Sequence, residues 1–317
     1  MNQNPTPSIQ IVEELIEATG IENPRFAFCP YKLSMFDCME PVFLECKNRG
    51  FVADLVPLTY QTLPDAEWHT ELLDFDKLGY EPIGFSDFRE RTYDFVVIHY
   101  PYDGNNNVTK LASYEFAGAL SRYGKILYIP YHGNIGGRQW SRFFTHPGAV
   151  QSDFICLGSK ADVDIFREVN PGYTGHIIQT ECSPKTECTK LHSNDPIPEQ
   201  YKTLHHPVTL ICGTLWTFTH EPFGRMQLHT EKIIQELEAG NTVIYRPHPL
   251  VYEAIAVMRP EALQKYNEFL NDVADLCILD SSPFLHHAIR VADKLIGDPS
   301  SVLNTWQGSG KPFEVMT

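Results

Sequence analysis

The sequence predicts an α/β protein. Strand-like and helix-like segments alternate over most of its 317 residues, a pattern typical of parallel sheets covered by helices on both faces. The chain is also long enough for two separate cores. A polar, proline-rich stretch from Ser183 to Glu199 interrupts the alternation and indicates a linker. We therefore expect two Rossmann-like domains facing a cleft, one over residues 1–190 and one over residues 200–317.

In the first half of the chain, apolar runs predict the strands and the segments between them predict the helices. Ser34 is expected to cap a helix over 35–48, with Asp37 in its first turn, where an acid is favourable. The segment 61–90, rich in Asp, Glu, Pro and Gly, is expected to be an irregular surface excursion. The other elements follow in order: strands at 25–29, 52–58, 93–99, 125–130, 153–157 and 176–180, and helices at 110–122 and 160–169.

The second half repeats the alternation. Each apolar run is again followed by a longer segment with helical periodicity. Strands are expected at 208–212, 241–245, 276–279 and 294–297. Helices are expected at 223–239, 260–272, 283–292 and 300–307.

Composition argues against several classes of protein. A net charge of −15 disfavours nucleic acid as a partner and disfavours a polybasic membrane-surface helix. No apolar run has the length of a membrane span, and the polar first ten residues do not resemble a secretory signal. We therefore expect a cytoplasmic protein.

Cysteines and histidines show no metal signature. The eight cysteines are scattered without a CxxC pair, which predicts reduced thiols. The adjacent pairs His205-His206 and His286-His287 are expected to be structural or to lie at the surface. The sequence therefore predicts no metal site.

Arg246 and His248 follow a predicted strand, and each is next to a proline that restricts the backbone. The carboxyl ends of parallel strands are where α/β proteins bind ligands. Arg246 has the planar fork that clamps phosphate oxygens, and His248 could donate a hydrogen bond to a diphosphate or protonate a leaving group. A rigid turn whose arginine pairs with an acid explains the same residues equally well.

Asp298, Ser300 and Ser301 lie where another predicted strand turns into a helix. Hydroxyls at a helix N-terminus suit a phosphate group, although a plain N-cap is commoner. Lys311, in a glycine-rich loop nearby, adds a cation, and Thr214 follows the first strand of the second domain. Together with Arg246 and His248, these residues predict half of a nucleotide-diphosphate site.

His132 is the corresponding candidate in the first domain. It follows the apolar run 126–129, and its ordinary pKa near neutrality suits a general base that takes a proton from an acceptor hydroxyl. A strand-end histidine satisfied by hydrogen bonds is the commoner case. Gly133 and Arg138 follow it, and His99 and Asp103 end another predicted strand. We assign these four residues to the acceptor side, with a rigid aromatic turn as the alternative for the last two.

Signatures of other enzyme classes are missing. The sequence has no GxSxG, no HExxH and no correctly placed GxGxxG. Hydrolase-triad, zinc-protease and dehydrogenase functions therefore lack support.

The order and spacing of these motifs resemble the CDP-glycerol glycerophosphotransferase family, whose members prime and polymerise teichoic acids in bacteria. The resemblance covers most of the chain. It is carried by PYKLSMFDCME (30–40), HYPYD (99–103), YHG (131–133), SPK (183–185), RPHP (246–249), DPSSV (298–302) and GKP (310–312).

The resemblance implies a GT-B-type fold and transfer of glycerol phosphate from CDP-glycerol to a polyol-phosphate or glycan acceptor, with no cofactor or metal required. On this basis His132 and His248 are catalytic. Arg246, Asp298, Ser300, Ser301, Lys311 and Thr214 bind the donor. Contact with the inner face of the membrane in cell-wall synthesis is left open, as is the oligomeric state.

Two alternatives remain. Tyr131 stands where the family has tryptophan, and Pro299 where it has an aromatic residue. The donor is therefore open among CDP-glycerol, CDP-ribitol and a UDP-sugar, and a UDP ligand would indicate a glycosyltransferase or a sugar 2-epimerase. The other alternative is a non-catalytic relative that binds a nucleotide or a partner protein.

Overall fold

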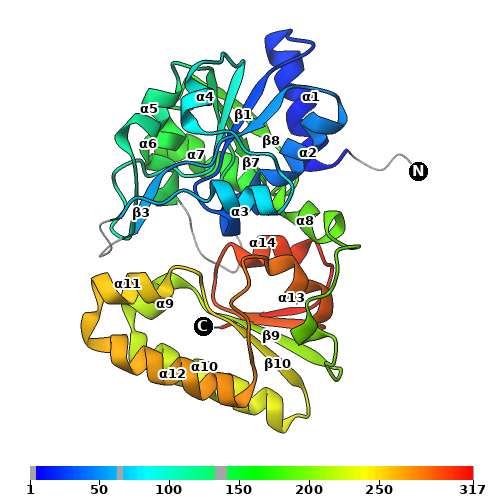
Figure 1. Ribbon diagram of the computed structural model, residues 1–317, viewed down its shortest axis with the longest axis vertical. Helices are drawn as coiled ribbons and strands as arrows, with labels where there is room; N and C mark the ends of the chain where they lie inside the picture. The colour runs from blue at the N-terminus through cyan, green and yellow to red at the C-terminus, as the bar shows by residue number, and fades with distance from the viewer. Residues whose placement is uncertain (1–4, 63–66, 133–140, 317) are drawn as a thin grey trace. The chain divides into compact units, whose positions relative to one another are not determined.

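The computed structural model describes residues 5–62, 67–132 and 141–316. The chain divides into two compact units, the first ending at Cys188 and the second beginning at Thr189. Each unit is built on a parallel sheet (Figure 1). The predicted α/β fold class is therefore confirmed for both halves, while the predicted cleft between them stays a prediction.

The first unit contains a six-stranded sheet in the order β2-β1-β4-β6-β7-β8. All its neighbouring strands are parallel. All six strands fall within the predicted runs, and β2 ends three residues before the predicted end. The strands are β1 (Phe26–Cys29), β2 (Ala53–Leu55), β4 (Phe95–Ile98), β6 (Lys125–Tyr128), β7 (Phe154–Leu157) and β8 (His176–Gln179).

Alternate strand residues face opposite layers of helices in this unit. Phe95 and Val97 pack with the helices α1 (Pro7–Thr19), α2 (Glu40–Asn48) and α3 (Leu72–Lys77). Val96 and Ile98 pack in the second core. That core also holds residues of α4 (Phe85–Arg89), α5 (Ala117–Leu120), α6 (Pro147–Val150) and α7 (Lys160–Val169).

Two predicted helices of the first unit are wrong in part. Over 35–48 the chain forms a 3-10 helix (Leu33–Cys38) and only then α2. Proline is tolerated in the first turn of a helix, so Pro41 fixes the start of α2, and Ser34 caps nothing. Over 110–122 the residues of β5 (Thr109–Leu111) pair antiparallel with β3 (Tyr60–Thr62) instead.

The second unit contains a five-stranded parallel sheet in the order β11-β10-β9-β12-β13. Two of its strands have the predicted bounds, and β13 was not predicted. The strands are β9 (Val208–Cys212), β10 (Thr242–Arg246), β11 (Ile278–Leu279), β12 (Lys294–Gly297) and β13 (Phe313–Val315).

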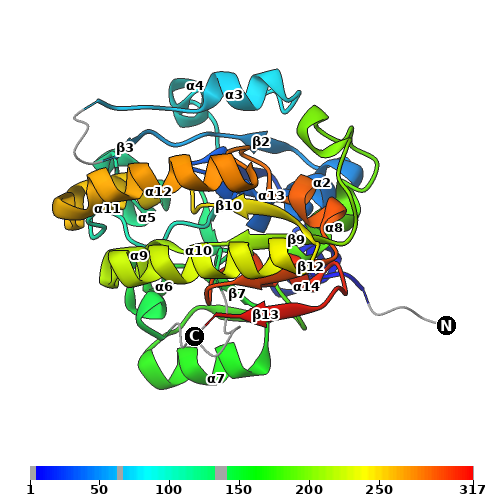
Figure 2. The same ribbon diagram turned by 90° about the horizontal axis from the view of Figure 1, so that it is seen from below.

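Helices cover both faces of this sheet as well. Tyr245 packs with α10 (Pro222–Glu238), α11 (Val251–Met258) and α12 (Leu263–Leu276), and the long helices α10 and α12 run side by side (Figure 2). Ile244 packs on the other face, with Trp306. The helices on that face are α13 (Leu285–Val291) and α14 (Val302–Gln307).

The predicted linker is not irregular throughout, because α8 occupies Lys185–Leu191. Within the described part of the chain, no helix combines the length and the apolar character needed to cross a bilayer.

Candidate functional site

The topology of the second sheet marks one position for ligand binding. From the central strand β9 the chain first adds β10 and β11 on one side, and then returns to add β12 and β13 on the other. This reversal places a switch point between β9 and β12, and ligands bind outside the carboxyl ends of the strands at such a point. Thr214, Arg246 and Asp298 all lie at this carboxyl edge, at the ends of three adjacent strands.

Asp298 is the centre of a buried hydrogen-bond network. Its side chain has 0% exposure. One carboxylate oxygen accepts the backbone N–H of Thr214 at 2.9 Å and the hydroxyl of Thr217 at 2.6 Å, and the other accepts Nη1 of Arg225 at 3.1 Å. Burial by itself raises the pKa of Asp298, but the adjacent His229 imidazole and these hydrogen bonds outweigh it and lower the pKa.

This geometry changes the role expected for Asp298. A fully buried carboxylate already bonded to three groups cannot also hold a ribose, so we treat it as a positioning residue that joins the β9 and β12 loops. The sequence interpretation missed Arg225 and His229. Their spacing of four residues on α10 puts both on one helical face, and that spacing was the available signal.

Arg246 makes a buried ion pair. Its Nη1 lies 2.5 Å from Oδ2 of Asp280 and 3.2 Å from the hydroxyl of Ser282. Arg246 is 6% exposed and Asp280 1%. The pairing with an acid that the sequence left open is thus present, and it holds the arginine at the end of β10. Both of these contacts use Nη1 of the guanidinium, and neither uses Nε or Nη2.

Asp280 was not predicted as part of the site. It follows β11, and Ser281 and Ser282 follow it, so this loop repeats the acid-and-two-serines composition of the loop after β12. That repetition at a strand end was a signal in the sequence.

His248 has a defined tautomer when it is neutral. The backbone N–H of Leu250 donates to Nδ1 at 3.1 Å, so Nδ1 is the acceptor and Nε2 carries the proton. A hydrogen-bond donor therefore follows Arg246 by two residues at the end of β10. This arrangement suits recognition of phosphate oxygens.

Ser300 and Ser301 do not act as ordinary helix caps. Ser301 has helical backbone angles and makes no side-chain cap hydrogen bond to α14. Ser300 is buried, and its carbonyl, not its hydroxyl, accepts the N–H of Leu303. Thr214 likewise precedes α9 (Leu215–His220) without a side-chain cap bond. Simple capping therefore does not explain these three hydroxyls.

Lys311 does not belong to the donor site, contrary to the sequence prediction. Its Nζ donates to the carbonyls of Ile289, Arg290 and Ala292 at 2.9, 3.0 and 2.6 Å and so caps the C-terminal end of α13. Lys311 precedes β13, which is parallel to β12, so it lies at the amino edge of the sheet, opposite Asp298. The prediction failed because β13 was not recognised as a strand.

We expect Lys311→Met to destabilise the protein by about 1 to 3 kcal/mol, because three carbonyls lose a charged donor. Nucleotide binding should be unchanged. Urea unfolding and calorimetric titration measure the two effects. Lys232→Met is the control, since Lys232 pairs with Glu314 away from α13. Weaker nucleotide binding at unchanged stability would restore the role that the sequence suggested.

His132 follows β6 in the first unit and is 4% exposed. Its Nε2 lies 3.3 Å from the hydroxyl of Tyr128. The rings of Phe143 and Phe144 lie 4.6 and 5.7 Å from its ring. The carboxyl-end position is as predicted, and the side chain lies among aromatic rings.

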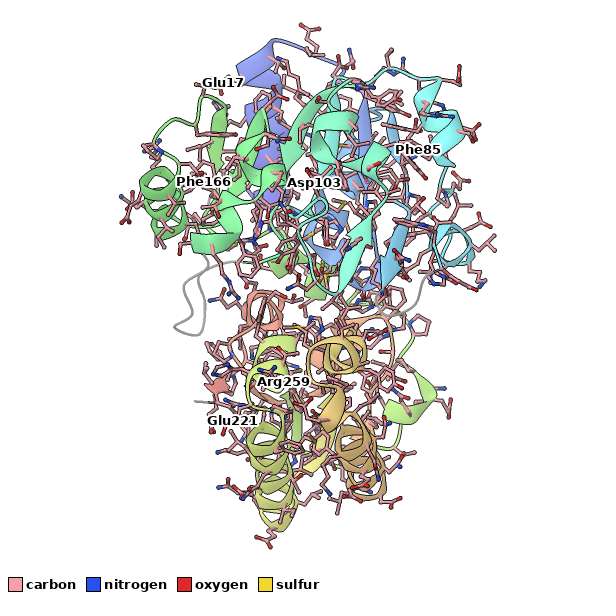
Figure 3. All side chains as sticks on the ribbon, turned by 90° about the vertical axis from the view of Figure 1, so that its left-hand side faces the viewer. Glu17, Phe85, Asp103, Phe166, Glu221 and Arg259 are labelled. Atoms are coloured by element: carbon pink, nitrogen blue, oxygen red, sulfur yellow. The ribbon has the colours of Figure 1, made fainter. Side chains whose placement is uncertain are left out.

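The acceptor-side role of His99 and Asp103 is not supported. His99 has 0% exposure, Tyr31 stacks on its ring, and burial, with the nearby Lys185, lowers its pKa to about 3. Asp103 is buried inside the unit (Figure 3), where it accepts the N–H of Ala117 at the start of α5. These contacts agree with the alternative of a rigid turn, and the acceptor-side role stays a prediction. Gly133 and Arg138 lie outside the described residues.

Lys185 is a buried cation of the first unit to which the sequence analysis gave no role. It is 5% exposed, and its Nζ lies 3.2 Å from Oδ1 of Asp37 and 3.4 Å from the carbonyl of Tyr131. It belongs to the SPK motif, and it contacts the residue directly before His132.

Comparisons with known proteins show the fold. A scan against protein-family models and a search of curated proteins both give no match. A Listeria monocytogenes protein assigned as a UDP-N-acetylglucosamine 2-epimerase matches with a TM-score of 0.63 and 14% identity, over 93% of this chain and 79% of that one. The UDP-GlcNAc 2-epimerase of Neisseria meningitidis, bound to UDP-GlcNAc, matches with a TM-score of 0.59 and 12% identity, over 92% and 81%.

The wall teichoic acid polymerase TagF also matches, with 12% identity over 97% of this chain and 74% of that one. Its TM-score of 0.47 is too low to draw a conclusion from the match. The epimerases are GT-B-fold enzymes, and the predicted GT-B-like fold class is confirmed. Identities this low show the fold alone.

Proposed function

We propose that the protein is a transferase that moves glycerol phosphate, or a related alditol phosphate, from a CDP-linked donor to an acceptor hydroxyl in bacterial cell-surface polymer synthesis. The observation that carries the proposal is the cluster at the carboxyl edge of the second sheet. There Arg246 and His248 end one strand, while Ser300 and Ser301 follow another two strands away. The motifs that resemble the glycerophosphotransferase family support the choice of donor.

In the proposed reaction, the acceptor oxygen attacks the phosphorus of the glycerol phosphate group. The new P–O bond forms as the bond to CMP breaks, and the proton of the hydroxyl passes to His132. Negative charge on the diphosphate is the main obstacle in such chemistry. Nε and Nη2 of Arg246, Nε2–H of His248 and the hydroxyls of Ser300 and Ser301 would stabilise it. The scheme uses no metal ion.

The buried network has a supporting role in this scheme. Asp298 fixes the backbone of Thr214 and the guanidinium of Arg225, and Asp280 fixes Arg246. Donors held in place before the ligand arrives need no reorganisation as charge develops. We therefore assign both acids as positioning residues.

A second candidate function is a sugar 2-epimerase or a nucleotide-sugar transferase that uses a UDP-linked donor. The observation that favours it is the fold match, with TM-scores of 0.63 and 0.59, to proteins described as UDP-GlcNAc 2-epimerases. A carboxyl-edge diphosphate site serves either donor, so ligand identity has to be measured.

A thermal-shift panel distinguishes the candidates. The ligands are CDP-glycerol, CDP-ribitol, CMP, CTP, UDP-GlcNAc and UDP. A ligand that binds only the folded state adds about 2.7 kcal/mol of stability at a hundred times its Kd. We expect CDP-glycerol or CDP-ribitol to give the largest shift, and the double variant Ser300→Ala/Ser301→Ala to lose most of it. Ser309→Ala is the control, because Ser309 bonds to the carbonyl of Trp306 after α14.

A larger shift with UDP ligands would replace the glycerophosphotransferase proposal by the epimerase or sugar-transferase function. A flat panel, or binding without turnover on any acceptor, would favour a non-catalytic relative.

A further inference from the structure

A cluster of metal-ligand side chains lies in the second unit, apart from the proposed diphosphate site. His192 and Asp195 belong to the chain that follows α8, and His286 lies in the first turn of α13. Figure 1 shows this chain running beside α13. One potential ligand atom of each residue lies within 4.8 Å of those of the other two. Residues about ninety positions apart in sequence thus offer two imidazoles and a carboxylate to one point.

The carboxylate of Asp195 joins the two imidazoles. Its Oδ2 lies 2.8 Å from Nδ1 of His192 and 3.5 Å from Nε2 of His286. The imidazole rings are stacked, with centroids 4.0 Å apart and planes 9° apart. One nitrogen of each ring therefore lies close to the same carboxylate oxygen.

The side chain of His286 is buried with a ring nitrogen that is unbonded within the described part of the chain. It is 7% exposed, and among the described residues its Nε2 has no hydrogen-bond partner, since the 3.5 Å approach to Asp195 lacks hydrogen-bond geometry. Buried polar atoms in folded proteins almost always have a partner, so an orphaned nitrogen calls for an explanation such as an ion.

We propose that His192, Asp195 and His286 bind a divalent transition-metal ion, with Zn²⁺ as the preferred occupant. Two imidazoles and one carboxylate are zinc ligands, and three protein ligands leave a fourth position for water. Zinc bonds of about 2.0–2.2 Å put tetrahedral ligand atoms roughly 3.3 Å apart. The present spacing of up to 4.8 Å closes to that value by side-chain shifts on the order of 1 Å.

Charges of both signs lie around the cluster. Nη1 of Arg290 donates to the carbonyls of His192 and Asp195, which places the guanidinium beside the cluster. A guanidinium at this position repels a cation. The carboxylate of Asp195 supplies the negative charge that offsets the metal.

A bound ion would tie two segments of the second unit together. The chain at 192–195 would be fixed to α13, and α13 begins directly after the loop in which Asp280 and Ser282 hold Arg246. The metal would thus steady the donor-side loop without touching the donor. This inference stands whether or not the protein transfers glycerol phosphate, and it departs from the sequence prediction of no metal site.

The test uses the full-length chain without a histidine tag, dialysed against a chelator and then titrated with Co²⁺ and Zn²⁺. We expect one Co²⁺ per chain with a visible absorption band, displacement of Co²⁺ by one equivalent of Zn²⁺, and a higher Tm with either metal. His286→Gln should weaken binding by at least about 10- to 100-fold, the loss that outer-shell partners alone produce. Asp195→Asn should act in the same direction.

The matched control is His206→Gln, since His206 forms another His–Asp pair, 2.7 Å from Asp293 in the same unit, and belongs to no three-residue ligand group among the described residues. It should bind metal as the wild type does. Circular dichroism confirms that each variant is folded. Absence of stoichiometric binding, or equal binding by folded His286→Gln, overturns the proposal.

Discussion

Replacing Asp298 by alanine is expected to destabilise the second unit by about 3 to 5 kcal/mol, the largest stability loss of any single substitution predicted for this chain. The carboxylate is fully buried and accepts hydrogen bonds from Thr214, Thr217 and Arg225. Removing one partner of a buried charge pair leaves the other charge uncompensated, and that costs about this much. Urea unfolding followed by circular dichroism and by the fluorescence of the buried Trp306 measures it.

Two further variants separate the causes. Asp298→Asn keeps the shape and an acceptor for the N–H of Thr214 but removes the charge opposite Arg225, so its loss should be smaller than that of the alanine variant. Glu268→Gln should leave the unfolding midpoint nearly unchanged, because its pair with Lys265 is exposed on α12. If Asp298→Ala were no more destabilising than Glu268→Gln, the network would not support the fold.

The pH dependence of this effect has a fixed sign. The folded-state pKa of Asp298 is lowered, below an unfolded value of about 3.9. A carboxylate with a depressed folded pKa contributes stability that is fully present above its unfolded pKa and is lost as pH falls through its folded pKa. The stability difference between wild type and Asp298→Ala should therefore be full at pH 7 and shrink below about pH 4. A difference that grows on acidification would contradict this assignment.

The sequence predicted the central strands well because their apolar runs have few alternatives. β9 and β12 have the predicted bounds, since each is a short run buried between two helical layers. The helix predicted over 110–122 failed at its start for a non-local reason, because Thr109–Leu111 pairs with β3, about fifty residues earlier, while α5 lies within the predicted range. Local periodicity contains no information about such a partner.

The candidate site was predictable to the extent that it lies at strand ends. Arg246 and His248 follow β10 as expected, and parallel topology brings them to the same edge as Thr214 and Ser300. Sequence motifs do not show which residue forms an ion pair with each charged side chain. The acid beside Arg246 comes from the loop after β11, and the cation beside Asp298 comes from α10. Lys311 shows the converse case, in which a motif residue caps a helix at the opposite edge of the sheet.

Loss of the imidazole at His132 is expected to have the largest effect on turnover if the protein is the proposed transferase. A positioned general base contributes about 10²- to 10⁴-fold, so His132→Ala should lower kcat by that factor. The Kd for the donor should be unchanged, because the proposed diphosphate ligands are all residues of the second unit. Single-turnover transfer assays and calorimetric titration with the CDP-linked donor measure the two quantities.

The surroundings of His132 provide a graded control. Tyr128→Phe removes only the hydroxyl that lies 3.3 Å from Nε2 of His132. If that hydroxyl orients the imidazole, the variant should lose less activity than His132→Ala and should shift the pH profile of kcat, whereas a purely structural role would lower stability without moving the profile. Full turnover in folded His132→Ala would remove the residue from the mechanism. Loss of donor binding in that variant would make it a binding residue instead, because a general base acts on the proton of the acceptor and not on the affinity for the donor.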